Sequence, residues 1–304
     1  MKTFAGYCKG QRGAVLIIVL WVVMLLSMLL ATYTRSIRVE TGIVRGMVRD
    51  ASMHAVAEGV VSYLAKVMAF DAEKFRSLEG SEQEIIIGGL AVNFRMIPEE
   101  SFVSLNSAPV EMLQVLISNL SEDIVDAESL AAAIVDWRDT DDLPLELGAE
   151  KDEYETAGLA WQPRNNSFES AGELQLVLGM TRLLSNRLKG YISLYSKSEV
   201  VNPRHASPDL IELLGGEAIK ADEFGLDDES DSLISDDGFF AVNQSDTYRI
   251  QMTLVVDEEK QDNGLQLTVS FGASEPSFEL KGDQPPYHIK QWSRYTSPVQ
   301  TSDE

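Results

Sequence analysis

A run of carboxylates between residues 136 and 154 is the part of this sequence best suited to chemistry. Five of them flank the turn-forming Gly148, and they are Asp139, Asp141, Asp142, Glu150 and Asp152. Calcium takes six to eight oxygen ligands and accepts irregular loops, whereas the segment holds no His or Cys to suggest zinc or iron. Because the spacing is not that of an EF-hand, the residues alone leave two interpretations open: a calcium site and a solvated acidic loop.

Signatures of catalysis are missing from the sequence. No G-x-S-x-G, P-loop or dinucleotide-binding glycine pattern occurs. Cys8 is the single cysteine, and His205 and His288 have no recognisable nucleophile partner. Carboxylates are so numerous that no particular pair indicates a glycosidase. We predict that the protein is not an enzyme.

Charge and size narrow the class of protein further. The chain has 304 residues, 44% of them hydrophobic, which is enough for about two domains with a real core. Its 48 acidic residues outnumber 25 Lys and Arg, so the net charge is −23. Nucleic-acid binding needs cationic side chains that displace counterions from phosphates. This balance therefore predicts no nucleic-acid partner.

The amino-terminal region predicts a membrane anchor. Residues 14–31 read AVLIIVLWVVMLLSMLLA, eighteen residues without a charge, which as a helix span about 27 Å. Three basic residues precede the segment and four arginines follow it by residue 49, so charge alone does not orient it. A cleaved secretory signal is a poor match because its exit would read Leu-Leu-Ala. A plain signal anchor remains open.

A third interpretation rests on the residues next to the apolar segment. Arg12 and Gly13 adjoin Ala14 with no spacer, and this join resembles the prepilin-peptidase site of type IV pilins and pseudopilins, cut between Gly13 and Ala14. Cleavage would remove three positive charges and leave a mature chain of −23 − 3 = −26. The same resemblance implies methylation of the new amino terminus.

The predicted helix continues beyond the apolar segment. No proline occurs from Thr32 to about Phe70, and apolar residues recur at helical spacing. They are Val56, Val60, Leu64 and Val67. One helix of roughly 50 residues, half in lipid and half packed on a globular head, is the plan of a pilin.

Strand patterns bracket a long helical region. Residues 84–98 predict a hairpin that turns at Gly88-Gly89. Alternating strands return only at 248–256, 265–271 and 287–295. The helical segments between them are 107–120, 128–139, 170–180, 181–192 and 207–216, and an acidic linker spans 221–237. The pattern predicts a helical domain inserted into a sheet.

Several strings make a resemblance specific. The strings SLNSAPVEMLQVL, IVDWRDTDDLP, GAEKDEY, FESAGELQLVLGMT and VNPRHASPDLIELLGG resemble the K-type minor pseudopilins of bacterial type II secretion systems. The resemblance covers roughly residues 9–220 and fades over the carboxy-terminal strands.

The resemblance implies an α+β fold, in which a pilin-like long N-terminal helix packs on a small antiparallel sheet with a large inserted helical domain. The expected parts are a leader (1–13), the transmembrane and amphipathic helix (14–70), the first part of the sheet (71–100), the inserted domain (101–220), an acidic linker (221–240) and the rest of the sheet (241–304).

An internal repeat supports a different function. Residues 103–116 and 200–214 share an extended entry with an Asn, a Ser/Pro turn and a Leu-rich helix, and look like helix-hairpin-helix units. A membrane-tethered DNA receptor is therefore the alternative. Such hairpins bind phosphate with help from Lys or Arg, yet residues 101–220 hold more acids than bases. We interpret them as scaffold.

Position and partners follow from the resemblance. The fifth residue of the mature chain is Ile18, where pilin-like families usually carry a Glu, and the K type is the member that lacks it. Without that carboxylate the subunit belongs at the tip, where nothing stacks beyond it. The resemblance implies the I- and J-type minor pseudopilins as partners, then the H-type and major pseudopilins, with prepilin peptidase as processing enzyme. The head would lie in the periplasm, anchored in the inner membrane.

Two sets of residues would serve this function. The partner helices would pack on a stripe of small and β-branched residues at Val44, Val48, Ala51 and Ala55. By resemblance, structural calcium, one ion or two, would bind in the inserted domain. Its expected ligands are Asp139, Asp141, Glu150 and Asp152, with Asp142 and Asn165 as further contributors.

Overall fold

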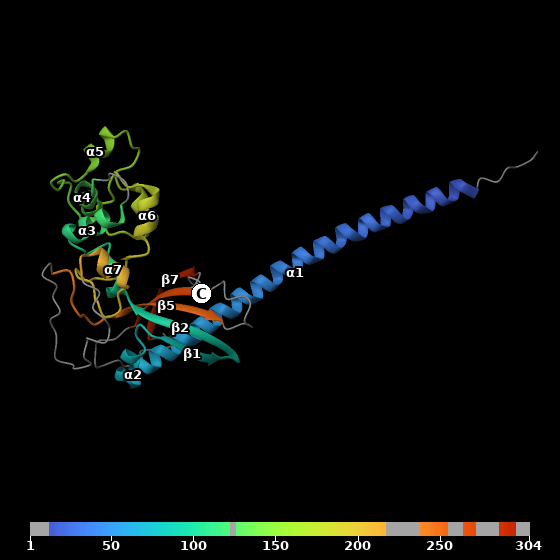
Figure 1. The fold of residues 1–304 in the computed structure, drawn as a ribbon, viewed down its shortest axis with the longest axis horizontal. Coiled ribbons are helices and arrows are strands. Elements are labelled where there is room, and N and C mark those ends of the chain that lie inside the picture. The colour runs from blue at the N-terminus through green and yellow to red at the C-terminus, as the bar shows by residue number, and fades with distance from the viewer. Residues whose placement is uncertain (1–11, 122–125, 217–237, 255–263, 272–285, 296–304) are drawn as a thin grey trace, which may run out of the picture. The chain divides into compact units, whose positions relative to one another are not determined.

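The structure is a computed structural model, and it describes residues 12–121, 126–216, 238–254, 264–271 and 286–295 (Figure 1). The chain divides into two units, one up to Glu58 and one from Gly59 onward. The predicted leader, apart from Arg12 and Gly13, and the acidic segment 221–237 lie outside the described residues.

The first unit is the amino-terminal part of helix α1 (Arg12–Phe70). Its stretch Leu16–Thr34 is long and apolar enough to cross a membrane, with a mean hydropathy of 2.6 and none of it buried. A helix this apolar on all sides is stable in lipid and unfavourable in water. The unit therefore fits a single-pass anchor.

The predicted apolar stripe along α1 is confirmed. Val56, Val60, Leu64 and Val67 are all buried, with Val60 and Leu64 fully inaccessible. Within the second unit, Asp71 caps the short helix α2 (Ala72–Ser77) by accepting from the Lys74 amide.

The five-stranded sheet of the second unit is antiparallel throughout, in the order β1-β2-β5-β6-β7. The strands are β1 (Glu82–Ile87), β2 (Leu90–Pro98), β5 (Thr247–Leu254), β6 (Gly264–Phe271) and β7 (Tyr287–Tyr295). The predicted hairpin is confirmed, because Gly88 and Gly89 turn the chain at positive φ of 60° and 84°.

Alternation buries one face of this sheet. Tyr248, Ile250, Met252 and Leu254 are buried as the period-two pattern predicts. Phe75 of α2 meets the rings of Tyr248 and Phe271 edge-on, with ring centroids 5.3 and 5.6 Å away. Figure 1 shows α2 at the end of the helix on which the strands lie.

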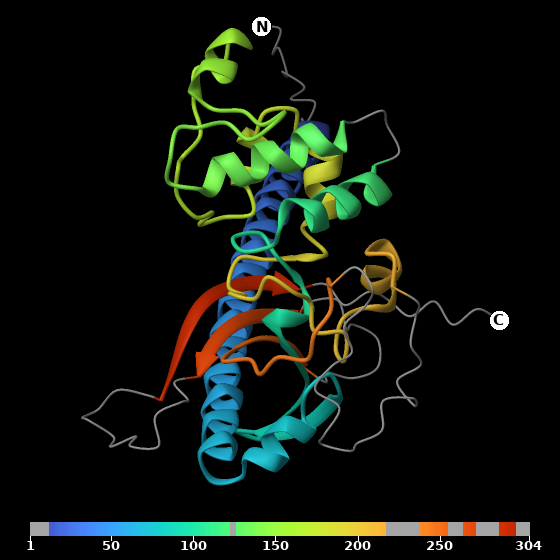
Figure 2. The same ribbon diagram turned by 90° about the vertical axis from the view of Figure 1, so that its left-hand side faces the viewer.

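The segment between β2 and β5 contains short helices joined by loops and has its own core. Its elements are η1 (Glu99–Ser101), β3 (Val103–Ser104), α3 (Val110–Leu120), α4 (Ala127–Arg138), α5 (Lys151–Thr156), η2 (Glu173–Leu176), α6 (Arg182–Leu188), β4 (Ile192–Ser193) and α7 (Pro208–Leu213). In Figure 2 the green and yellow helices group together, apart from the orange and red strands. Their core includes Leu116, Ile134, Tyr154 and Leu174.

One predicted helix is wrong. Residues 170–180 form only the 3₁₀ turn η2, which ends where the backbone becomes extended at Val177. Gly179, at φ 82°, then turns the chain away before α6 begins. The other predicted helices form: α4 has the expected length, one position earlier, and α3, α6 and α7 are shorter than expected.

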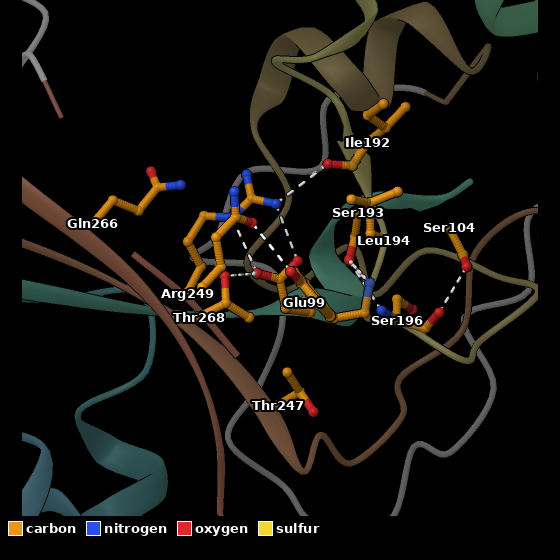
Figure 3. Close-up of polar contacts among 12 residues, drawn as sticks. Glu99, Ser104, Ile192, Ser193, Leu194, Ser196, Thr247, Arg249, Gln266 and Thr268 are labelled. Carbon is orange, nitrogen blue, oxygen red and sulfur yellow. Dashed lines mark hydrogen bonds and ion pairs between the residues drawn. The ribbon is translucent and has the colours of Figure 1, made fainter. Parts of the chain in front are cut away.

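A buried ion pair joins the sheet to the helical segment (Figure 3). Glu99, fully buried, follows β2 directly, and Arg249 of β5 donates to both of its carboxylate oxygens at 3.1 and 3.0 Å. The same guanidinium donates to the Ile192 carbonyl at 3.2 Å and lies 3.7 Å from the Phe102 ring centroid. Thr268 of β6 donates to Glu99 at 3.3 Å.

Replacing Arg249 with Met tests this joint. The variant leaves the Glu99 carboxylate buried without its cation, so we expect the free energy of unfolding to fall by about 3–5 kcal/mol. Urea unfolding of the detergent-purified chain, followed by tryptophan fluorescence, measures it. The double variant Glu99→Gln/Arg249→Met should regain most of the loss. A single variant as stable as the parent chain would contradict the assigned role.

Candidate metal centre

The acidic loop runs from the carboxyl end of α4 to the amino end of α5. Asp139 caps α4, and Glu150 is the residue before the first turn of α5. Asp136, fully buried on the last turn of α4, holds the loop by accepting from the amides of Leu145 at 3.1 Å and Ala149 at 2.7 Å. A Cβ at Gly148 would lie 1.9 Å from the Asp136 Oδ2 atom, so this close approach needs glycine.

Fixing the loop in this way brings unsatisfied oxygens into the interior. Glu150 is only 4% exposed; its side chain faces the Glu153 amide in the capping box of α5, but neither carboxylate oxygen makes a hydrogen bond of full geometry among the described residues. The Oδ1 atoms of Asp139 and Asn165 are also buried and unpartnered there. Buried polar atoms without partners are costly. Four such oxygens, two on Glu150 and one each on Asp139 and Asn165, are of the chemical type that ligates calcium.

The charges at this site act on one another. Burial, and then the nearby carboxylates of Asp136, Asp139, Asp142 and Asp141, raise the pKa of Glu150 from 4.5 to about 7. Burial and the charges of Asp141 and Asp136 also raise the pKa of Asp139. Carboxylates that hinder one another's ionisation are stabilised by a shared cation.

Asn165 ties the outer part of the loop to this region. Its backbone has a positive φ of 51°, and its amide nitrogen donates to the Asp141 carbonyl at 2.9 Å and to Asp142 Oδ1 at 2.8 Å. Both contacts use the side-chain nitrogen of Asn165, so its side-chain oxygen, Oδ1, remains available to other groups. The loop therefore gathers Asp139, Asp141, Asp142, Glu150 and Asn165.

The set of candidate metal ligands is incomplete in two respects. Asp152 lies on the first turn of α5 with its side chain exposed. Within the described ranges, no three His, Cys, Asp or Glu side chains are already set closely enough to hold a metal ion. The residues fit calcium by donor chemistry, and closing on an ion requires side-chain movement.

The other predicted site residues are spread along α1. Val44, Val48, Ala51 and Ala55 are exposed on the helix. Ile18 is exposed within the apolar stretch. Gly13 and Ala14 lie in the first turns of α1, and their side chains are outside the described set.

Sequence reasoning missed the polar residues that connect the parts of the head. His205 has its Nε2 atom 3.3 Å from Glu79 Oε2. Glu79 and His205 are 126 positions apart in the chain (205 − 79). No local sequence pattern predicts either this pair or the Glu99–Arg249 pair.

In comparisons with known proteins, the central segment of the chain matches one family model. Residues 92–197 match the family model for type II secretion system (T2SS), protein K. Two relatives, each named type II secretion system protein K, come from Pectobacterium carotovorum subsp. carotovorum (31% identity over 96 residues) and Klebsiella pneumoniae (33% over 107 residues). The matches cover 32% and 35% of this chain and only 29% and 33% of those relatives.

The fold extends the likeness beyond the matched segment. A chain in the crystal structure of the GspK-GspI-GspJ complex from the enterotoxigenic Escherichia coli type 2 secretion system superposes with a TM-score of 0.58. The superposition covers 84% of this chain and 99% of that one, at 14% sequence identity. At that identity the comparison supports the fold alone, and the fold is the expected α+β arrangement.

The raised pKa of Glu150 predicts how stability depends on pH without metal. The folded chain keeps this proton up to about pH 7, whereas the unfolded chain releases it near 4.5. The free energy of unfolding in chelator should therefore fall as pH rises from 4.5 to 7. Glu150→Gln should flatten the profile and melt above the parent at pH near 7.5, whereas Glu146→Gln, exposed on the same loop, should not. Parallel melting profiles for Glu150→Gln and the parent would contradict it.

Proposed function

Because residues 92–197 match the family model for type II secretion system protein K, we propose that this chain is a minor pseudopilin at the tip of the type II secretion pseudopilus. The observation that carries the proposal is the place of the family segment. It begins in β2 and supplies the helices that interrupt the sheet before β5, in a chain whose α1 carries an apolar stretch. In this role the chain starts assembly and caps the filament during export.

The proposal includes processing and anchoring. Prepilin peptidase cuts between Gly13 and Ala14, the stretch Leu16–Thr34 holds the mature chain in the inner membrane, and the head projects into the periplasm. Ile18 in place of a carboxylate leaves nothing to neutralise the terminal ammonium of a subunit stacked beyond this one. That supports the tip position.

The mass of the chain purified from membranes tests the processing step. We expect loss of residues 1–13, with or without one methyl group on Ala14, in cells with prepilin peptidase. In cells lacking the peptidase, the chain should keep its leader. An uncut chain in both strains would make it an ordinary signal-anchored protein.

The partners we propose are the I- and J-type minor pseudopilins, followed in the filament by the H-type and major pseudopilins. The fold-level match is to a chain from a complex that contains GspI and GspJ. On α1, Val44, Val48, Ala51 and Ala55 are exposed and share one side of the helix at i, i+4, i+7, i+11 spacing. Small residues there let a second helix approach closely.

Enlarging this stripe tests the interface. Ala51→Leu/Ala55→Leu should reduce co-purification of the I- and J-type subunits at least tenfold, because the added side chains hold the helices apart. Gly46→Leu is the matched control, since it lies on a different side of the helix with nothing within 4 Å of an added Cβ. Equal recovery of partners from the double variant and the control would exclude the stripe as the interface.

We also propose structural calcium in the acidic loop. Asp139, Asp141, Asp142 and Glu150 would hold it with the Asn165 carbonyl oxygen, and Asp152 would join by movement of the first turn of α5. The support is the set of buried oxygens without partners. Bound calcium supplies the positive charge that these carboxylates lack and so couples ion binding to loop folding.

Thermal unfolding with calcium or chelator tests the site. At calcium 100-fold above its Kd, stability should rise by about 2.7 kcal/mol. Glu150→Gln and Asp139→Asn should each remove most of that gain, and Glu146→Gln should not. Asp152→Asn reports whether α5 contributes. Identical melting curves in calcium and chelator would refute the calcium proposal.

A further inference from the structure

A cavity of about 410 Å³ lies in the head, away from the acidic loop. It opens between the end of α1, α2 and the segments around residues 202–205 and 242–245. Its polar lining includes Arg76, Glu79, Asn202, Arg204, His205 and Tyr248. The volume lies in the range of roughly 300–1,000 Å³ typical of small-molecule sites.

The charged groups of this cavity do not cancel. Glu79, its one lining carboxylate, already accepts from the Tyr248 hydroxyl at 3.1 Å and has His205 Nε2 at 3.3 Å. Arg76 and Arg204 make no ion pair with any residue that the structure describes. Among the charged lining side chains, two unpaired guanidinium groups thus stand against one carboxylate that is already paired, while the carboxylates of Glu100 and Asp246 act on Tyr248 from outside the lining.

The wall that carries Arg204 and His205 is held in place before any ligand arrives. Asn202 Oδ1 accepts from the Arg204 amide at 3.1 Å, and Asn202 Nδ2 donates to the Asn243 carbonyl at 3.1 Å. Gly80, at φ 71°, lets the backbone approach His205 so closely that a Cβ there would lie 2.5 Å from Nδ1. A preformed wall lowers the entropic cost of binding.

We infer that this cavity binds a small soluble anion bearing a carboxylate or phosphate group. The guanidinium fork of Arg76 or Arg204 matches such a group with two parallel hydrogen bonds. The amides of Asn202 and its neighbours Asn243 and Gln244 provide donors and acceptors for polar groups next to the anion. The mostly polar lining does not suit an apolar ligand.

Calorimetric titration of the metal-free, detergent-purified full chain tests the inference. The probes are inorganic phosphate and succinate, titrated in sodium chloride of constant ionic strength, with glucose as a neutral comparison. We expect saturable binding of one anion per chain by at least one probe and none by glucose. Preference for phosphate or for succinate identifies the group recognised.

Two variants of equal charge locate the binding. Arg76→Gln/Arg204→Gln should weaken binding at least tenfold, whereas Arg182→Gln/Lys197→Gln, which removes two exposed cations outside the cavity lining, should leave it within twofold. All four side chains belong to exposed residues, and melting curves verify that both variants fold. Absence of saturable binding, or equal weakening by both pairs, would overturn the inference.

Discussion

The buried ion pair of Glu99 and Arg249 is the contact on which the head depends. Strand β2 ends at Pro98, so Glu99 is the first residue to leave the sheet, and Arg249 on the neighbouring β5 fixes where it goes. Because the same guanidinium also binds the Ile192 carbonyl of β4, one side chain ties the start of the helical segment to the strand that follows α6. Burying two charges is favourable only with good geometry and further hydrogen bonds, and Thr268 and the Phe102 ring supply further contacts.

Two of the buried carboxylates in the head, Glu99 and Glu150, differ in their surroundings. At the joint, Glu99 is paired with a guanidinium and both carboxylate oxygens accept hydrogen bonds. In the acidic loop, Glu150 is also buried but has neither a cation nor a hydrogen bond of full geometry among the described residues. The first arrangement is complete within the chain. The second is not complete within the described part of the chain, and this difference is what motivates the calcium proposal.

Local patterns predicted the parts of this fold better than their connections. The α1 stripe, the Gly88-Gly89 hairpin and the alternation in β5 each repeat over a few residues, so composition and spacing identify them. Residues 170–180 have helical spacing, yet the backbone becomes extended at Val177 and left-handed at Gly179, so the segment makes only one turn. Glu99 and Arg249 are 150 positions apart, and only the folded chain brings them together. In the acidic loop, the sequence identifies the carboxylates around Asp139 as candidate metal ligands. The exposure of Asp152, by contrast, depends on where α5 begins.

The short parallel pairing of β3 with β4 has a consequence for how such a head is built. Val103 lies opposite Ile192, so the chain leaves and re-enters the joint at neighbouring points although 89 positions separate them (192 − 103). The entropic cost of closing a loop rises only slowly with its length, by about 0.6 kcal/mol for each doubling. The pairing of β3 with β4 holds the two ends of the intervening chain together. Because the closure cost depends so weakly on length, that chain can change in length and surface over evolutionary time while the sheet keeps its register. The same scaffold can in this way present different outer surfaces without being redesigned.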